Sequence, residues 1–529
     1  MKENYKETVF RPKTQFEWKT EDICMSGYQR QNGDIVELTA AGLEAVRSHK
    51  NNYADSTRPL AMDERRWSAW DMGNLWIGML VSIAVYQVAS GLIVSGMSWG
   101  EALFTIVLGH FLVMVFAVVL GHFGTKYGLT YPMLCKMVFG SKGTVVPSLV
   151  RGILGCFWFG VQAWIGGQAV NAILAVFLPF WNGLGFKGLF ISFLIFWLMN
   201  VYIAGSGSGA VQKLEKFAAP VLILLSFIVI IWGMYTADWS ISGLLSEPSI
   251  QGNPDADFWK LFFPALSSMI AFDGGIALSM ADFTRNCKTQ KAQMVGQLAG
   301  APVMTAFIAF VGICGTAGAS LAFHEAIWEP AVLVSKFDNP AIVIIFSLFI
   351  IMAVLTTNVA ANLVPPTNVL ATLFAKKISY KKAALIAAVL ALFAQPWNAL
   401  ASAYDLIYNV CGLLGALLGP ISGLYLVSYL LEHKTHVDMV DLYREDGGRY
   451  YYKGGWNTAI IAIFLAATAV IIAGKYITPL NFLFDNAYVI GSVGAGLLYY
   501  IYLKIQNKRN GVNENDEDNH QTRHDCVTE

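Results

Sequence analysis

The sequence predicts an all-α integral membrane protein with twelve transmembrane helices, and two observations carry that prediction. Of the 529 residues, 55% are hydrophobic and only 14% are charged, whereas an ordinary soluble domain has about 25% charged residues. The apolar residues also gather into runs of about 20, the length of a helix that crosses a bilayer, with glycine and polar residues between the runs. The pattern therefore favours a polytopic membrane protein over a large soluble core.

The expected spans follow the apolar runs in chain order. They cover residues 69–94, 100–121, 147–173, 187–205, 216–236, 260–281, 296–320, 341–364, 381–397, 401–430, 457–475 and 486–505. If these spans alternate across the bilayer, the basic residues fall on one side, in the segments around Arg65, Lys126, Lys213, Arg285, Lys376 and Arg444. Basic loops stay in the cytoplasm, so we expect a plasma-membrane protein with both termini cytoplasmic.

The two ends of the chain are polar. Residues 1–60 have no apolar core pattern and no cleavable signal peptide, and residues 507–529 are expected to be a disordered tail. The 36 basic and 36 acidic residues balance, and nothing suggests nucleic-acid binding. The seven cysteines are scattered without a metal spacing or a disulfide framework, so we interpret them as packing residues.

One apolar span carries an unusual polar stretch. Residues 356–366 read Thr-Thr-Asn-Val-Ala-Ala-Asn-Leu-Val-Pro-Pro inside the segment that begins near Ile342. Each unsatisfied polar group in hydrocarbon costs several kcal/mol, so these side chains must face something other than lipid. The stretch predicts a binding site in the eighth span.

Two further spans, five apart in order, contain glycine and polar residues near their middle. Residues 73–78 of the first span read Gly-Asn-Leu-Trp-Ile-Gly, and residues 271–275 of the sixth read Ala-Phe-Asp-Gly-Gly. Paired interrupted helices in two halves are typical of inverted-repeat transporters, whose sites lie near the midplane. The alternative is that the glycines only allow close helix approach, which does not account for Asp273.

Several motifs occur in the order of a known family. They are Leu-Trp-Ile-Gly at 75–78, Lys-Tyr-Gly at 126–128 followed by Phe139-Gly140, Phe-Trp-Phe-Gly-Val-Gln-Ala-Trp-Ile-Gly-Gly at 157–167, Asp-Phe-Thr-Arg at 282–285, and the stretch in span eight. Between about Arg65 and Tyr450 the chain resembles the nucleobase–cation symporter family of purine, cytosine, uracil, allantoin and hydantoin permeases. The resemblance implies a five-plus-five inverted repeat of the leucine-transporter type plus two C-terminal helices.

On this organisation the chain divides into five parts. Residues 1–64 are a cytoplasmic extension, 65–236 the first repeat, 237–432 the second repeat, 433–506 a loop with the last two spans, and 507–529 the tail. The implied function is cation-coupled uptake of a nucleobase or a related planar heterocycle, with Na⁺ as the expected coupling ion. The alternatives are a proton-coupled permease for allantoin or a vitamin-type pyrimidine, and a sensor derived from a transporter.

The resemblance assigns the substrate site to three side chains. Trp158 and Gln162 are four residues apart, hence on one helix face, so an indole plane and an amide can meet the same planar ligand. The family uses this pair to stack on and hydrogen-bond its heterocycle, and Asn362 occupies its other amide position. Asn358 is expected to ligate or to bridge backbone, and Trp164, on another face, to pack.

The resemblance also implies a Na⁺ site built from hard oxygen ligands. These are the carbonyls of Gly78, Val81 and Ala353 and the hydroxyls of Thr356 and Thr357. The alternative is that both hydroxyls bond back to carbonyls of their own helix.

Span six departs from the family, because Asp273 stands where several relatives carry a second stacking tryptophan, with Phe272 beside it. Phe272 is expected to supply the aromatic face. Three roles are open for the carboxylate: accepting substrate N–H groups, carrying a coupling proton, or bracing a broken helix. In span one, Ser82 replaces an amide of the hydantoin transporters, so hydantoin is not favoured.

The remaining polar residues have weaker assignments. His110 and His122 are expected to be satisfied histidines, Asp405 and Asn409 to line the cavity entrance, and Tyr404 to be part of a gate. An intramembrane enzyme would need a nucleophile–base pair or metal ligands at depth, and no such spacing occurs in the sequence. The sequence does not name the heterocycle.

Overall fold

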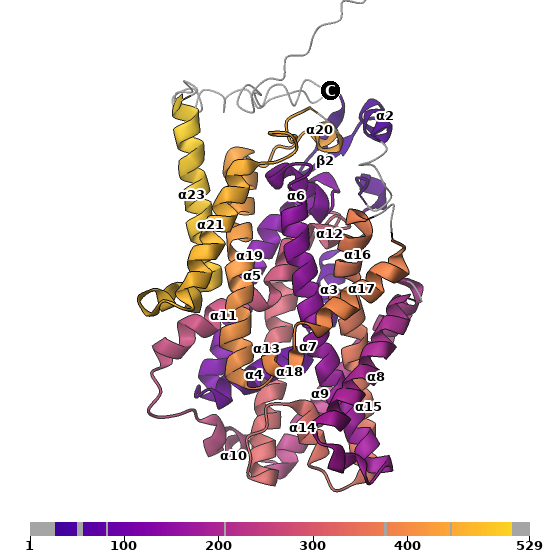
Figure 1. Cartoon of the computed structure of the whole chain (residues 1–529), viewed down its shortest axis with the longest axis vertical. Helices are drawn as coiled ribbons and strands as arrows, with labels where there is room; N and C mark the ends of the chain where they lie inside the picture. The colour runs from indigo at the N-terminus through magenta and orange to yellow at the C-terminus, as the bar shows by residue number, and fades with distance from the viewer. Residues whose placement is uncertain are drawn as a thin grey trace, which may run out of the picture.

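The computed structural model is almost entirely helical (Figure 1). It describes residues 27–49, 57–80, 83–205, 208–374, 378–444 and 447–509. Val81 and Ser82, two of the predicted site residues, lie outside this part of the chain. The one described sheet is a hairpin of β1 (Gln29–Asn32) and β2 (Ile35–Leu38), followed by helix α2 (Ala40–Ser48).

A helix occupies each of the first five expected spans. They are α3 (Ala69–Leu80) with α4 (Ile83–Val94), α5 (Trp99–Tyr127), α7 (Val145–Phe177), α8 (Phe186–Gly205) and α9 (Ser208–Thr236). The axes of α3 and α4 meet at 62°. The first span is therefore bent, but the predicted interruption within 73–78 is wrong, because these residues are helical and the bend falls between Leu80 and Ile83. Gly73 instead lies against α13, because a Cβ on Gly300 would be 2.9 Å from the Cα of Gly73.

The later spans are more irregular. They are α11 (Phe258–Leu278), α13 (Gln290–Phe323), α15 (Pro340–Thr357) continued by η4 (Asn358–Leu363) and α16 (Val364–Leu373), α17 (Tyr380–Leu392), η5 (Asp405–Val410) with α19 (Cys411–Leu426) and η6 (Val427–Glu432), α21 (Thr458–Gly474) and α23 (Ala487–Arg509). Short helices join them, among them α6 (Tyr131–Phe139), α10 (Ile241–Leu245), α12 (Ala281–Thr284), α14 (Pro330–Ser335), α18 (Pro396–Ala399), α20 (Met439–Tyr443) and α22 (Asn481–Asp485).

Fewer helices than the twelve predicted spans are long enough to cross a bilayer in the described part of the chain. Among the described residues, eight helices are long and apolar enough to cross a membrane, or ten if each of the two bent pairs is one span. The 13 residues of α17 rise only about 20 Å, less than the hydrocarbon core. The membrane prediction is confirmed, whereas twelve full crossings stay a prediction.

Span six is not interrupted where the sequence predicted. Helix α11 runs without a break from Phe258 to Leu278, so residues 271–275 are helical. Gly274 serves close packing, because a Cβ there would lie 2.8 Å from Cε2 of Tyr488 on α23. The irregular backbone comes later, at Ser279 and Met280 before α12. Gly274 is thus a packing residue, as the alternative interpretation held, whereas a Cβ on Gly275 would meet no described atom within 4 Å.

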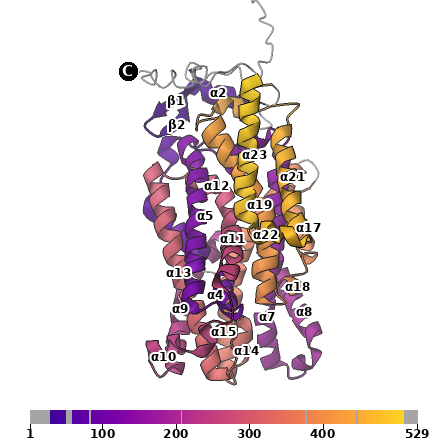
Figure 2. The ribbon, with the colours of Figure 1, turned by 90° about the vertical axis from the view of Figure 1, so that its left-hand side faces the viewer.

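Helices from the two halves of the chain interleave. In the structure α3 packs on α13, α5 on α11, and α7 on α15. The α5–α11 crossing depends on Gly109, where a Cβ would be 2.5 Å from Cβ of Met269. Helices α21 and α23 stand to one side, against α19, in both views (Figures 1 and 2).

The N-terminal extension is folded from residue 27, contrary to the expectation of a segment without a core pattern. Val36 and Val46 belong to the main buried cluster. Gln29 holds the connection after η6, donating to the carbonyl of Val437 and accepting from the amide of Met439. The hairpin and α2 lie at the end opposite α10 and α14 (Figure 2). At the other terminus α23 continues to Arg509, so the expected tail begins later than residue 507.

Candidate substrate and cation site

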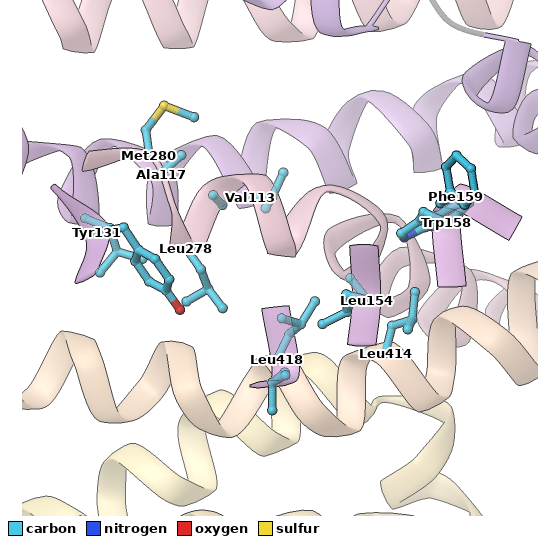
Figure 3. Packing of buried hydrophobic residues seen from close by; sticks show 14 of the residues in the cluster. Val113, Ala117, Tyr131, Leu154, Trp158, Phe159, Leu278, Met280, Leu414 and Leu418 are labelled. Carbon is cyan, nitrogen blue, oxygen red and sulfur yellow. The ribbon is translucent and has the colours of Figure 1, made fainter. Parts of the chain in front are cut away.

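Trp158 and Gln162 lie on one face of α7, as their spacing predicted. Trp158 is 8% exposed and belongs to the buried cluster that also holds Leu154 and Leu414 (Figure 3). The ring of Phe272 on α11 approaches it with centroids 4.8 Å apart and planes at 68°. The structure therefore brings together the two aromatic residues predicted for the ligand, one edge-on to the other.

Gln162 connects the substrate residues to the predicted cation residues. Its Oε1 accepts a hydrogen bond from the Thr357 hydroxyl at 3.1 Å. Its Nε2 donates to no described residue, so this N–H group is available to a ligand. The same amide that can hydrogen-bond a heterocycle is thus tied to one of the predicted Na⁺ ligands.

Three of the five predicted Na⁺ ligands lie together at the end of α15. The Ala353 carbonyl accepts hydrogen bonds from the Thr356 hydroxyl at 2.8 Å and from the Thr357 hydroxyl at 3.1 Å. Both hydroxyls therefore bond back to their own helix, as the alternative interpretation held, and their oxygens still cluster around one carbonyl. Gly78 lies in the last turn of α3, directly before the break in span one.

A chain of amides runs from Asn362 into the protein. Asn362 Nδ2 donates to Asn358 Oδ1 at 3.1 Å, and Asn358 Nδ2 donates to the Phe159 carbonyl at 3.1 Å and to Asn200 Oδ1 at 3.3 Å. Asn358 thus bridges backbone. Asn362 keeps its oxygen and one N–H group free of described partners. Asn200 was not among the predicted site residues, although a lone asparagine in the apolar fourth span was a visible signal.

The backbone of span eight is a π-helix at residues 358–363, the segment that contains Asn358 and Asn362. Pro365 and Pro366 follow at the start of α16 and have no N–H group to donate to the preceding turn. The wider π turn accommodates the backbone carbonyls that these two prolines leave without a donor. Segments of π-helix inside α-helices are frequent at functional sites. Gly155 of α7 permits the contact, because a Cβ there would lie 2.6 Å from Cδ of Pro366.

The Asp273 carboxylate lies against α5. In the continuous helix α11 this group lies between helices, with Oδ2 3.1 Å from Nε2 of His110 on α5. His110 Nδ1 is 2.8 Å from the Ile106 carbonyl. The structure thus places Phe272, and not the carboxylate beside it, next to the predicted ligand residues.

The other singled-out residues have local roles. His122 is a satisfied histidine, with Nδ1 2.7 Å from the Tyr429 hydroxyl. Trp164 packs among Phe186, Phe193 and Trp397, as predicted. In η5, Asp405 accepts from Ser402 and Asn409 at 2.7 and 2.9 Å. The ring of Tyr404, an exposed residue, lies 4.7 Å from that of Tyr408.

Two buried carboxylates lie outside the spans. Asp282, from the Asp-Phe-Thr-Arg motif, accepts the Tyr131 amide at 2.7 Å and so caps α6; burial raises its pKa to about 6. Glu329, before α14, accepts from Gln168 of α7 at 3.2 Å, and burial raises its pKa to about 7. The Glu329–Gln168 pair, which was not predicted from the sequence, joins the segment before α14 to the helix that carries Trp158 and Gln162.

Comparison with known proteins gives a consistent result. Residues 59–494 match a family described as permeases for cytosine/purines, uracil, thiamine and allantoin. The purine-uracil permease NCS1 of Arabidopsis thaliana is 34% identical, with 85% of this chain and 77% of that protein aligned. The allantoin permease of Bacillus subtilis is 30% identical, with 84% of this chain and 92% of that protein aligned.

Solved structures agree on the fold. The inward-facing form of Mhp1 superposes with a TM-score of 0.73 at 23% identity, covering 86% of this chain and 94% of Mhp1. A Na⁺-coupled sialic acid symporter superposes with a TM-score of 0.54 at 13% identity, over 86% of this chain and 95% of the symporter. From its sequence motifs, its fold and the match over residues 59–494, the chain belongs to the family of permeases for cytosine/purines, uracil, thiamine and allantoin.

Proposed function

We propose that this permease imports a planar nitrogen heterocycle of the nucleobase or allantoin type and that Na⁺ drives the uptake. The observation that carries the proposal is the hydrogen bond between Thr357 and Gln162, which joins the predicted cation ligands to the predicted substrate ligands. Membership of a permease family supports transport, and it argues against an enzyme.

The Thr357 hydroxyl provides the physical link. It has one hydrogen and three acceptors in reach: Gln162 Oε1 at 3.1 Å, the Ala353 carbonyl at 3.1 Å and the Val354 carbonyl at 3.3 Å. A Na⁺ ion bound to the Thr357 oxygen and the Ala353 carbonyl repels the hydroxyl hydrogen from that carbonyl. The hydrogen then goes to Gln162, fixing its oxygen on Thr357 and turning its Nε2 towards the ligand.

The same link predicts cooperative binding. If Na⁺ orients Gln162 for the substrate, bound substrate must tighten Na⁺ by the same factor, because linkage of binding free energies is reciprocal. Asn362 offers a donor and an acceptor, which suits the lactam or cyclic urea edge of a heterocycle. Trp158 supplies a ring face on which the heterocycle can stack, and the Phe272 ring packs edge-on against Trp158. The names of the two aligned relatives, a purine-uracil permease and an allantoin permease, fit this ligand class.

Alternating access would follow from a five-plus-five repeat. A two-fold axis that relates spans 1–5 to spans 6–10 exchanges span one with span six and span two with span seven. A contact between spans one and seven must then be matched by a contact between spans six and two. The packing of α3 on α13 and of α11 on α5 meets this requirement. Gly78, whose carbonyl is a proposed cation ligand, lies in the last turn of α3, beside the bend of 62° in span one. The end that carries the hairpin and α2 would face the cytoplasm.

The test is uptake by purified protein in liposomes. A thermal-shift screen of heterocycles first identifies a ligand, since binding to the folded state raises its melting temperature. Radiolabelled ligand is then offered under an inward Na⁺ gradient, an inward proton gradient, or neither. Accumulation with Na⁺ alone supports the proposal. Accumulation with the proton gradient alone replaces it by the proton-coupled alternative, and binding without accumulation indicates a sensor.

A further inference from the structure

Asn200 is the inner end of a line of three asparagine side chains that leads to the substrate residues. It lies in α8, which packs on α7 and on η4, the π segment that carries Asn358 and Asn362. Asn200 and Asn358 are fully buried, and Asn362 is 7% exposed. Two glycines of α7 permit the close approach, because a Cβ on Gly166 or Gly167 would lie 2.3 or 2.5 Å from an atom of α8. The last two residues of the Phe157–Gly167 motif thus place Asn200 beside the helix that binds the ligand.

Two backbone carbonyls determine which way each amide in this line points. A carbonyl oxygen can only accept a hydrogen bond. Asn200 Nδ2 therefore faces the Phe196 carbonyl at 2.8 Å, which leaves its Oδ1 to accept from Asn358 Nδ2 at 3.3 Å. The other hydrogen of Asn358 Nδ2 goes to the Phe159 carbonyl at 3.1 Å. Both hydrogens of Asn358 are thus engaged, and neither amide can turn over without setting two oxygens against each other.

The same direction reaches Asn362. The only polar atom that Asn358 has left is Oδ1, which accepts from Asn362 Nδ2 at 3.1 Å. Asn362 therefore keeps its oxygen and one N–H group free of described partners. We infer that Asn200 is a positioning residue that acts through Asn358, holds the Asn362 oxygen towards the substrate and so selects heterocycles that present an N–H group to it. This inference rests on the proposed function, since it names a property of the imported heterocycle.

Removing the Asn200 amide should weaken this direction. Leucine has the same branching as asparagine and no polar side-chain atom, so Asn200→Leu leaves one hydrogen of Asn358 without its acceptor. It also removes one of the two oxygens that oppose a reversed Asn358. A reversed Asn358 donates to Asn362 Oδ1, and Asn362 then turns its N–H groups towards the ligand. A site in that state no longer requires an N–H group on the heterocycle.

The first test is equilibrium binding to the full-length purified protein. The probes are uracil, hypoxanthine and allantoin, each with its singly N-methylated derivatives, because a methyl group replaces one N–H group and leaves the carbonyls in place. The wild type should bind a parent compound more tightly than the derivative methylated at the nitrogen that meets Asn362. Asn200→Leu should narrow this ratio of affinities about fivefold, the effect of one net hydrogen bond.

Ser192→Ala is the matched control on the same helix. Ser192 is fully buried and donates to the Gly188 carbonyl at 2.9 Å, so the change also removes a buried hydrogen bond from α8 but leaves the three asparagines intact. It should keep the wild-type ratio. A general weakening of the site lowers the affinities for the parent and the methylated compound alike. An unchanged ratio in Asn200→Leu would therefore overturn the inference.

A second test needs no ligand. Asn200→Leu and Asn358→Leu break the same hydrogen bond, so the double variant should lose less melting temperature than the two single variants together. Additive losses would equally overturn the inference. If Asn200→Leu does not fold, Asn200→Ser replaces it in both tests, because the shorter side chain bonds back to its own helix and loses Asn358. If no probe binds, the proposed heterocycle transport is contradicted, and the melting temperatures alone decide the role of Asn200.

Discussion

Replacing Thr357 by valine tests the link between cation and substrate most directly. Valine keeps the shape of threonine and removes only the hydroxyl, which donates to Gln162 and lies among the predicted Na⁺ ligands. The variant therefore deletes one hydrogen bond and one cation ligand without opening a cavity. Substrate affinity and its Na⁺ dependence should both fall.

The magnitude follows from the contacts. Removing the donor leaves the half-buried Gln162 Oε1 without its partner, and such a loss costs about 1–3 kcal/mol. Each 1.4 kcal/mol is a factor of ten, so substrate affinity at saturating Na⁺ should fall about 5- to 150-fold. Thr356→Val should behave differently, because among the described residues the Thr356 hydroxyl bonds to the Ala353 carbonyl alone. It should weaken Na⁺ and leave substrate affinity without Na⁺ unchanged.

The assay is equilibrium binding of the screened ligand to purified protein, with Na⁺ and with choline in its place. Thr357→Ser keeps the hydroxyl and is the matched control, so it should retain most of the affinity and its Na⁺ dependence. If Thr357→Val binds the ligand with wild-type affinity and wild-type Na⁺ dependence, Thr357 does not couple the two sites. A loss of affinity shared equally by Thr357→Ser would point to packing instead of the hydroxyl.

Three further changes test other parts of the structure. Trp158→Ala should lower ligand affinity about 5- to 100-fold, since stacking on an aromatic ring contributes about 1–3 kcal/mol, and Trp158→Phe should recover part of it; unchanged affinity in the alanine variant would remove Trp158 from the site. Glu329→Gln should raise the melting temperature at pH 8 but not at pH 4, because burial raises the Glu329 pKa to about 7 and the stabilising protonated form is lost as the pH rises through that value; an equal effect at both pH values would contradict this. Gly109→Ala should destabilise the protein, since its Cβ would lie 2.5 Å from that of Met269, and a wild-type melting temperature would show that the crossing can relax.

The sequence predicted the features that depend on composition and spacing. Apolar runs located a helix for every expected span, and the four-residue spacing correctly put Trp158 and Gln162 on one face of α7. The polar stretch of span eight coincides with its π-helix at residues 358–363. The Thr357–Gln162 hydrogen bond could not be predicted from the sequence, because it joins residues 195 positions apart. Only the packing of α7 on α15 brings them together.

The sequence did not predict the directions in which the side chains of α11 point, and Asp273 shows why. Asp-Gly-Gly in a span predicts either unwound backbone or close packing, and the two choices aim the carboxylate in different directions. Contacts of α11 with α5 and α23 decide the matter: Gly274 must be small to admit Tyr488, and this fixes the helical turn that sends Phe272 to Trp158 and Asp273 to His110. A functional role for Asp273 stays a prediction from its place in a membrane span, while its partner His110 follows only from the helices packed around it.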